Sequence, residues 1–184
     1  MPILEAIRTH PKNILLAMGA RFAENGFFYI YATFTLAYAT QALGMNRQDI
    51  LNAVLVAAAI EVFTIPMFGA LSDHLGRRPV YIFGAVFSAI MSIPLFMLLE
   101  TRSPQMAMLA ITLGLAIGHA AMYGPQASFL SELFGTKVRY SGVSLGYNLA
   151  SVFAGALSPL VATWLMTKYS PETWPISVYM MGLA

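Results

Sequence analysis

Three ionisable residues, Glu24, Glu61 and His119, lie within long apolar stretches of this 184-residue sequence. Inside a membrane such a group costs at least about 2.5–3.5 kcal/mol on insertion scales, so it usually faces a protein interior or a water-filled cavity. Carboxyl and imidazole groups exchange protons, and removal from water favours the protonated carboxyl. We interpret the three residues as candidate proton-coupling groups. The structural alternatives are a protonated hydrogen-bond donor at Glu61 and a satisfied core histidine at His119.

Arg21 is a fourth ionisable residue within an apolar stretch. On a helix it shares one face with Glu24 and Asn25, because residues three and four apart are neighbours. A guanidinium binds a carboxylate through two parallel hydrogen bonds, so Arg21 is a candidate for binding a substrate carboxylate while Glu24 takes a proton. The alternative is a buried Arg21–Glu24 ion pair that only neutralises itself. The predicted substrate-binding residues are Arg21, Asn25, Gln126, Tyr147 and Asn148.

The elements that position these side chains are predicted to be transmembrane helices. Hydrophobic residues make up 58% and charged residues 10% of the sequence, whereas a soluble domain has about 25% charged residues. A spanning helix needs about 20 predominantly apolar residues. We therefore predict an all-α membrane protein, with a cytoplasmic juxtamembrane segment at 1–13 and a helix bundle at 14–184. Its five full spans and the start of a sixth are 14–42, 50–71, 80–99, 106–130, 141–166 and the stretch from Pro175 to Ala184.

The depths of the polar residues can be compared at about 1.5 Å of rise per residue. Glu24, Glu61 and His119 each lie about 15 Å from the same end of their spans, near the middle of a bilayer of about 30 Å. Arg21, Gln126, Tyr147 and Asn148 form a shallower layer on the predicted cytoplasmic side. The sequence therefore predicts two layers of polar residues, one near the midplane and one nearer the cytoplasmic side.

Two spans differ from the others in composition. The stretch 80–99 carries no charge and few hydroxyl groups, so we predict that it is peripheral and faces lipid. The stretch 141–166 has a small residue at every fourth position, which allows close approach of another helix. These residues are Gly142, Gly146, Ala150, Ala154 and Ser158.

Composition also excludes several classes of protein. The net charge is +2 without a cluster of cations, which disfavours nucleic-acid binding. The absence of cysteine excludes disulfides and thiolate sites. No cofactor motif, metal cluster or nucleophile–base arrangement is visible, so neither an enzyme nor a cofactor is expected.

The cations in the loops predict the orientation in the membrane. Loop cations are more numerous on the side of the N-terminus, which the positive-inside rule assigns to the cytoplasm. They are Arg8, Lys12, Arg77, Arg78, Lys137 and Arg139 on that side, against Arg47, Arg102 and Lys168 on the other.

The loop between the second and third spans reads G-x-x-x-D-x-x-G-R-R-P from Gly69 to Pro79. Gly69 would permit close helix approach, Gly76 would supply a left-handed helix stop, and Pro79 would open the next helix. This pattern resembles the signature of the major facilitator superfamily. The resemblance implies that Asp73, Arg77, Glu132 and Arg139 belong to a charge network that controls gating. The full predicted gating motif is Gly69, Asp73, Gly76, Arg77, Arg78, Glu132 and Arg139.

The stretches 21–25, 123–134, 138–142 and 144–147 are similar to the metabolite:proton symporters, which include carriers of citrate, 2-oxoglutarate, shikimate and proline or betaine. Gly135 departs from that pattern, where proline is usual. The resemblance implies the C-terminal six-helix half of a twelve-span carrier, with its last helix truncated. Such a carrier lies in the inner membrane of a prokaryote and symports a small organic anion or zwitterion with a proton by alternating access. Its energy source is the proton gradient, and its partner is a missing N-terminal half.

A different function stays open at this point. A half-carrier could be a non-transporting membrane module that acts only when it assembles with a partner half. An uptake assay on the chain alone is the first test, because the half-carrier hypothesis predicts no uptake without the complementary half.

Overall fold

The computed structural model describes residues 7–135 and 138–184, and this part of the chain is helical without a strand. The predicted loop cation Lys137 and the first six residues of the predicted juxtamembrane segment lie outside the described residues. The elements are α2 (Pro11–Tyr29), the π-helix η1 (Ile30–Phe34), α3 (Thr35–Gln41), α4 (Arg47–Leu75), α5 (Arg77–Glu100), α6 (Pro104–Leu113), the π-helix η2 (Gly114–His119), α7 (Ala120–Glu132), α8 (Arg139–Tyr169) and α9 (Trp174–Leu183).

Each predicted span corresponds to a helix or to a run of continuous helical elements. By length and composition, four helices in the described part are able to cross a membrane: 47–75, 77–100, 104–132 and 139–169. The run from Pro11 to Gln41 is not among them, since it carries Arg21, Glu24 and Asn25. The polar residues that are candidates for substrate and proton binding thus lower the mean hydropathy of this helical run.

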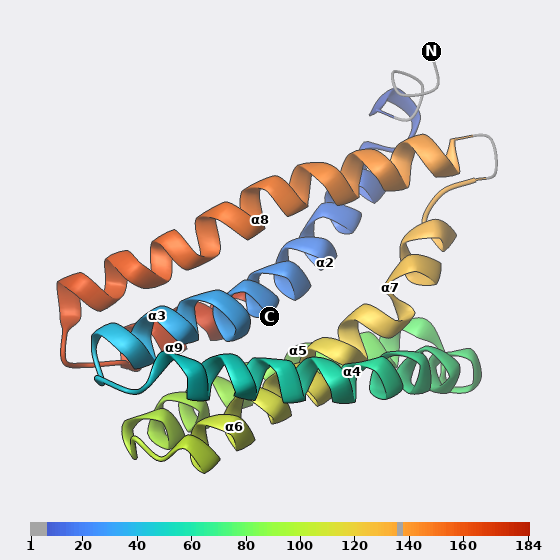
Figure 1. The fold of residues 1–184 in the computed structure, drawn as a ribbon. Coiled ribbons are helices and arrows are strands. Elements are labelled where there is room, and N and C mark those ends of the chain that lie inside the picture. Colours follow the sequence, from blue (N-terminus) through green and yellow to red (C-terminus); the bar gives the residue numbers. More distant parts are fainter. Residues whose placement is uncertain (1–6, 136–137) are drawn as a thin grey trace.

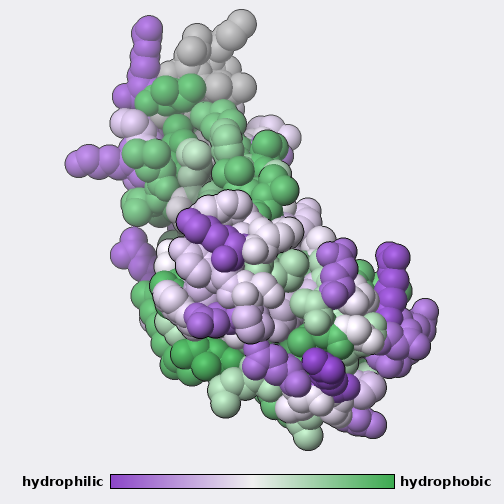
Figure 2. Space-filling view, turned by 90° about the vertical axis from the view of Figure 1, so that its left-hand side faces the viewer, coloured by the Kyte–Doolittle hydropathy of each residue, from purple (hydrophilic) through white to green (hydrophobic). Residues whose placement is uncertain are grey.

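The helices form two groups that diverge toward the end where the N-terminus lies (Figure 1). One group pairs α2, η1 and α3 with α8, and the other contains α4, α5 and the run α6–η2–α7, while α9 contacts both α5 and α8. Figure 2 looks onto the opposite end, where hydrophilic and intermediate residues cover most of the near face and hydrophobic residues show at its lower left and on the part of the molecule above it. This distribution is typical of a bundle whose ends meet water and whose sides meet lipid.

The predicted stripe of small residues packs α8 against α2. The buried residues of α8 are Gly142, Gly146, Ala150, Ala154, Ser158 and Ala162. A methyl group at Gly146 would lie 2.9 Å from the Cβ atom of Ala17, so the two helices approach as closely as their backbones allow. The prediction of a close helix contact along this face is confirmed.

The prediction that 80–99 is only peripheral is wrong for one face of α5. Ile82, Val86 and Ile90 are exposed as expected for a lipid-facing surface. The opposite face is buried, because small residues there admit neighbouring helices: a Cβ atom at Gly84 would lie 2.7 Å from the Gly118 carbonyl oxygen. Ser92 adds a polar contact, since its carbonyl accepts a hydrogen bond of 3.0 Å from Ser177 of α9.

Two π-helical segments interrupt the first and fourth helical runs. A π-turn closes its hydrogen bonds one residue later than an α-turn and shifts the register of the side chains that follow. Thr35 provides a hydrogen-bond donor to a backbone carbonyl of η1, because its hydroxyl donates to the Ile30 carbonyl at 3.0 Å. The segments also touch, since the ring of Tyr31 in η1 packs on Gly114 in η2. The second segment ends at His119 and therefore sets where this side chain points.

The crossing of α4 and α7 depends on Gly124 more than on Gly69. A Cβ atom at Gly124 would lie 2.6 Å from the Ile65 carbonyl oxygen and 2.8 Å from the Gly69 nitrogen, whereas one at Gly69 would meet the Gly124 oxygen at 3.4 Å. We expect Gly124→Ala to destabilise, because a backbone clash of about 1–3 kcal/mol exceeds the gain of up to about 1 kcal/mol from alanine in a helix. Thermal unfolding in detergent should give a lower Tm for Gly124→Ala than for the matched control Gly69→Ala; equal values would contradict this packing.

Candidate functional site

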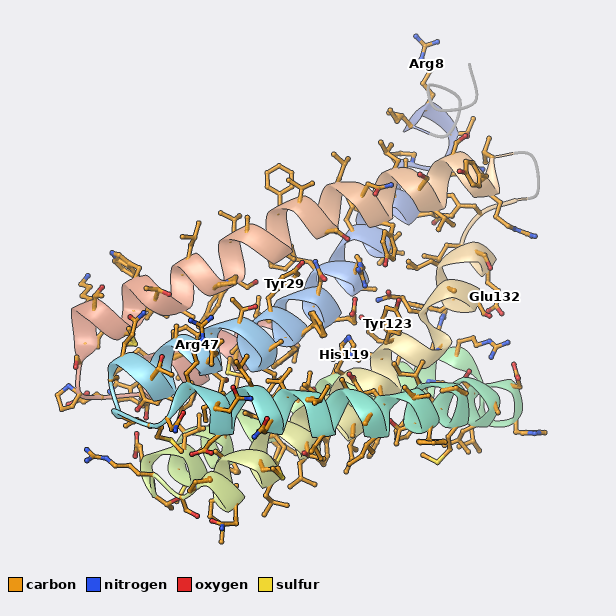
Figure 3. The ribbon with its side chains drawn as sticks, viewed as in Figure 1. Arg8, Tyr29, Arg47, His119, Tyr123 and Glu132 are labelled. Carbon is orange, nitrogen blue, oxygen red and sulfur yellow. The ribbon has the colours of Figure 1, made fainter. Side chains whose placement is uncertain are left out.

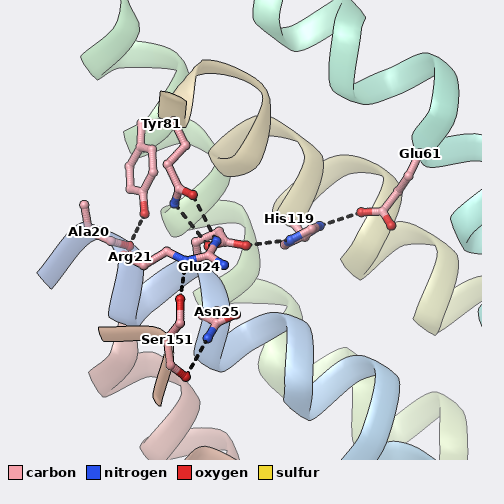
Figure 4. Close-up of polar contacts among 9 residues, drawn as sticks. Ala20, Arg21, Glu24, Asn25, Glu61, Tyr81, His119 and Ser151 are labelled. Atoms are coloured by element: carbon pink, nitrogen blue, oxygen red, sulfur yellow. Dashed lines mark hydrogen bonds and ion pairs between the residues drawn. The ribbon is translucent and has the colours of Figure 1, made fainter. Parts of the chain in front are cut away.

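A buried row of three ionisable side chains crosses the middle of the bundle. His119 lies between two carboxylates, with Nδ1 2.5 Å from Oε1 of Glu61 and Nε2 2.8 Å from Oε1 of Glu24. The residues come from η2, α4 and α2, and their exposed fractions are 4%, 7% and 1%. Figure 4 shows the row as a continuous chain of contacts. The three residues predicted to share one depth do meet.

The contacts of His119 fix how many protons the row holds. Each ring nitrogen faces a carboxylate oxygen, so one proton must lie in each of the two contacts. Either an imidazolium donates to two carboxylates, or a neutral imidazole donates to one and accepts from the protonated other. Both arrangements have the same proton count, and together with the Arg21 cation both are formally neutral. The row can therefore pass a proton along its length without gaining or losing charge.

Aromatic rings hold the imidazole in place. Its centroid lies 5.0 Å from that of Phe28 and 5.3 Å from that of Tyr123, whose ring is stacked on it at 25°. His119 and Tyr123 lie in the middle of the molecule, between Arg47 near one end and Glu132 near the other (Figure 3). These two aromatic contacts restrict rotation of the imidazole ring, whose nitrogens are directed at the two carboxyl groups.

Arg21 adjoins this row through Glu24. Its Nη1 pairs with Oε2 of Glu24 and also donates to Oε1 of Gln126 at 3.0 Å. Gln126 in turn donates to the same Glu24 oxygen at 3.1 Å. The Nε atom donates to the Ser151 hydroxyl at 3.0 Å, and the guanidinium carbon lies 3.9 Å above the ring of Tyr147. The predicted ion pair is present, and the guanidinium is held by contacts from three helices.

The predicted substrate layer assembles with one exception. Asn25 lies next to Arg21 and donates to the Ser151 carbonyl at 3.3 Å. Asn148 does not lie beside Arg21: its side chain is exposed and donates back to the Ser144 carbonyl of its own helix at 2.8 Å. Tyr147 and Asn148 are adjacent on α8, so they point about 100° apart and only one can face α2.

Two side chains in this region were missed by sequence reasoning. Ser151 binds Arg21 from α8, and Tyr81 of α5 donates its hydroxyl to the Ala20 carbonyl. Ser151 lies four residues after Tyr147, one turn along the same face of α8. That spacing was the available signal. Tyr81 offered none, because α5 carries no charged residue between 80 and 99 that would have directed attention to it.

The loop motif gathers charges at one end of α4, α5 and α7. Arg77 pairs with Asp73 at 2.5 Å and with Glu132 at 3.5 Å, and it donates to the Ser72 hydroxyl at 2.6 Å.

The two glycines of the motif differ from the prediction. Gly76 has a φ of 95° but a ψ of 151°, so it adopts an extended conformation open to glycine rather than the predicted left-handed helical one. Gly69 lies at the crossing with α7, but a Cβ atom there would meet the Gly124 oxygen only at 3.4 Å, so the close approach depends on Gly124 rather than on Gly69.

Two predicted members do not join this charge cluster. Arg78 is exposed, and Arg139 directs its Nε atom to the Phe134 carbonyl at 3.3 Å, within its own connection. Among the described residues, neither forms an ion pair with Asp73 or Glu132. The end of α7 diverges from the start of α8 (Figure 1), and the printed partner of Glu132 is Arg77 of α5 rather than Arg139.

A cleft of about 650 Å³ opens between the end of α7 and the first turns of α8. Its lining combines aromatic, hydroxyl, amide and guanidinium groups from Ser131, Arg139, Tyr140, Val143, Ser144, Tyr147 and Asn148. Tyr147 also lies under Arg21, so its ring separates the cleft from the buried cluster. A volume of this size accommodates a small metabolite.

Comparison with known proteins gives a consistent picture. The family model described as Major Facilitator Superfamily matches residues 15–184. The chain is 33% identical to the shikimate transporter of Escherichia coli (strain K12), over 99% of this chain and 42% of that protein. It is 31% identical to a glycine betaine/proline/ectoine/pipecolic acid transporter of Dickeya dadantii (strain 3937), over 95% of this chain and 35% of that protein.

A third relative is an inner membrane metabolite transport protein of Escherichia coli (strain K12), 28% identical over 100% of this chain and 42% of that protein. The chain thus spans about two fifths of the length of these curated relatives. No solved structure matched it.

Proposed function

The chain belongs to the major facilitator superfamily, and from that premise we propose that it acts as the C-terminal half of a proton-coupled carrier for a small organic anion or zwitterion. The N-terminal side would face the cytoplasm of a prokaryotic cell, and a second six-helix half would complete the transport path. The observation that carries the proposal is the buried row from Arg21 through Glu24 and His119 to Glu61. It joins a cation able to bind a carboxylate to groups able to carry a proton.

Arg21 would bind the substrate, with Asn25, Gln126 and Tyr147 around it. The substrates named for the relatives support a carboxylate as the common feature, since shikimate, proline and glycine betaine each carry one. Asn148, which lines the cleft, would contact the substrate on its way to the buried cluster. Proton coupling would be carried by Glu24, His119 and Glu61, and no cofactor is proposed.

The experiment is an uptake panel on the complete carrier in liposomes. Labelled shikimate, proline and glycine betaine are offered with an inward proton gradient, with and without a protonophore. We expect at least one of them to accumulate and the protonophore to remove that accumulation. Accumulation that survives the protonophore would refute proton coupling, and no uptake of any of them would refute a carrier of this substrate class.

The gating role of the charge cluster is tested by cysteine labelling, since the natural sequence has no cysteine. Ser144 lines the cleft, so Ser144→Cys reports access from that side. Arg77→Ala removes the contacts to Asp73 and Glu132. These are partly exposed ion pairs worth about 0–1 kcal/mol, so we expect unchanged folding and a maleimide labelling rate at Ser144→Cys that rises about two- to fivefold, as a shift of up to 1 kcal/mol allows.

The matched control for this experiment is Arg78→Ala, which removes a neighbouring exposed cation that forms no ion pair with Asp73 or Glu132 in the described part of the chain. It should leave the labelling rate unchanged. The alternative to a gating role is that the charge cluster only holds the loop between α4 and α5 in place. In that case Arg77→Ala, Arg78→Ala and the parent should be labelled by maleimide at equal rates.

The second candidate is a membrane module that has no transport activity of its own and acts only by assembly with a partner half. Reconstitution of the 184-residue chain alone tests only whether the chain transports substrate without a partner half. The half-carrier proposal requires uptake to appear when the complementary half is present. Assembly without uptake of any panel compound would favour the module.

A further inference from the structure

The contacts of Arg21 leave a substrate carboxylate no free pair of donors. A guanidinium offers parallel hydrogen bonds along two edges, each of which includes either Nε or Nη1. Nη1 is bound to Glu24 and Gln126, and Nε is bound to the Ser151 hydroxyl. Two-point binding of a carboxylate must therefore displace one of these partners.

Charge decides which partner has to yield. If the substrate displaced only Ser151, two carboxylates would share one cation in a region where Arg21 and Glu24 are 7% and 1% exposed. Like charges in a buried site are strongly disfavoured, and the usual relief is protonation of one of them. The carboxylate in position to be protonated is Glu24, because its Oε1 atom already faces Nε2 of His119 at 2.8 Å.

The proton transfer can be written without moving any helix. The Nε2–H bond of His119 breaks, an O–H bond forms at Oε1 of Glu24, and the imidazole keeps its Nδ1 proton and donates it to Glu61. Glu24 is then neutral and its hold on Arg21 is weakened. An incoming carboxylate adds one negative charge, and one proton taken up from solvent by the His119–Glu61 pair restores neutrality.

In the part of the chain that the structure describes, the other titratable groups around Glu24 and its partners Arg21 and His119 are three tyrosines. Tyr81 from α5 directs its hydroxyl to the Ala20 carbonyl, Tyr147 from α8 stacks under Arg21, and Tyr123 from α7 stacks on His119. A phenol is a much weaker acid than a carboxyl group or an imidazolium, so the three tyrosines have no assigned part in the proton transfer. The exchangeable proton is confined to Glu24, His119 and Glu61.

We propose that the substrate carboxylate and the carboxylate of Glu24 compete for Arg21, and that protonation of Glu24 resolves the competition in favour of the substrate, so that one carboxylate binds with one proton. This inference rests on the proposed function, because it assigns the order of events at the same site. It adds that Glu24 acts as an internal stand-in for the substrate. The ion pair seen in the structure is then the substrate-free state of the site.

The experiment measures binding to the complete carrier in detergent between pH 6 and 9, using whichever of labelled shikimate, proline or glycine betaine binds. For the wild type, the Kd should rise about tenfold per pH unit over the pH range in which Glu24 competes as an ionised carboxylate. A tenfold change per pH unit is expected when one proton binds together with each substrate molecule. Glu24→Gln mimics the protonated residue. Its Kd should be independent of pH and, at pH 9, at least about tenfold lower than that of the wild type.

A second measurement needs no variant. Binding in unbuffered solution should remove about one proton from the medium per molecule of probe bound. The same probe esterified at its carboxyl group is the matched control, because it cannot compete with Glu24, and its binding should take up no proton. This readout is independent of whether Glu24→Gln folds.

The outcomes separate this inference from the proposed function. A wild-type slope that persists in Glu24→Gln, or binding without proton uptake, would overturn the competition while leaving the carrier intact. A Glu24→Gln variant that folds but binds more weakly at every pH would show that Glu24 only supports Arg21, and it would also overturn the competition. Failure of the wild type to bind any of the three probes would count against the proposed function itself.

Discussion

Arg21→Ala is expected to abolish carboxylate uptake by the complete carrier, with a loss of at least about 30-fold. Truncation of one partner of a buried, hydrogen-bonded charge pair costs about 2–5 kcal/mol, and about 1.4 kcal/mol corresponds to tenfold in binding. In this site the guanidinium holds Glu24, Gln126 and Ser151 at once. The measurement is initial-rate uptake of shikimate, proline and glycine betaine.

A loss of uptake in Arg21→Ala could also come from misfolding, because Glu24 would be buried without its partner. The double variant Arg21→Gln/Glu24→Gln removes both charges and retains hydrogen-bonding groups of similar size. We expect it to restore expression and Tm but not uptake. Arg47→Ala, an exposed arginine near the opposite end of the bundle from Glu132, is the matched single control and should transport normally. Full uptake by the double variant would eliminate Arg21 as the carboxylate-binding residue.

His119→Gln is the second substitution with a large expected effect. Glutamine can bridge Glu61 and Glu24 by hydrogen bonds, but it cannot accept and release a proton in the range where imidazole does. A pH gradient of one unit drives about tenfold accumulation when one proton accompanies each substrate. We expect this ratio to fall to about one in His119→Gln, while exchange of labelled for unlabelled substrate continues within a few-fold of the wild-type rate.

The control for His119→Gln is His74→Gln, at an exposed histidine near the end of α4. It should retain the accumulation ratio of the wild type. Glu61→Gln tests the far end of the row and should resemble His119→Gln, because Glu61 lies 2.5 Å from Nδ1 of His119. Retained accumulation in both His119→Gln and Glu61→Gln would place the coupling proton elsewhere in the carrier.

Much of the arrangement was accessible from the sequence because membranes impose regular lengths. The apolar stretches correspond to helices, and counting residues from the ends of separate spans placed Glu24, Glu61 and His119 at one depth. The count succeeded because an α-helix rises by a constant amount per residue. The stripe on α8 was predictable for a related reason, since a period of four residues selects one face of a helix.

The errors arose where a residue's direction, rather than its depth, mattered. Asn148 has the depth of Arg21 but faces away from it, and Arg139 has the sequence context of the gating cluster but lies apart from Glu132. The buried face of α5 is not evident from the lack of charge and the few hydroxyl groups between 80 and 99, because it is formed by small residues that admit η2, α7 and α9. The π-turns at η1 and η2 also rotate everything that follows them, and no residue type announces them.

Composition, apolar length and helical period suffice to assign this chain to the membrane, to divide it into spans and to rank its polar residues by depth. They are properties of one helix at a time. That His119 bridges two carboxylates, and that Ser151 and Gln126 occupy Arg21, depends on the rotation and crossing of α2, α4, η2, α7 and α8 relative to one another. Those rotations follow from packing at positions such as Gly124 and Gly146, where contacts between distant segments, absent from any local pattern, determine which side chains meet.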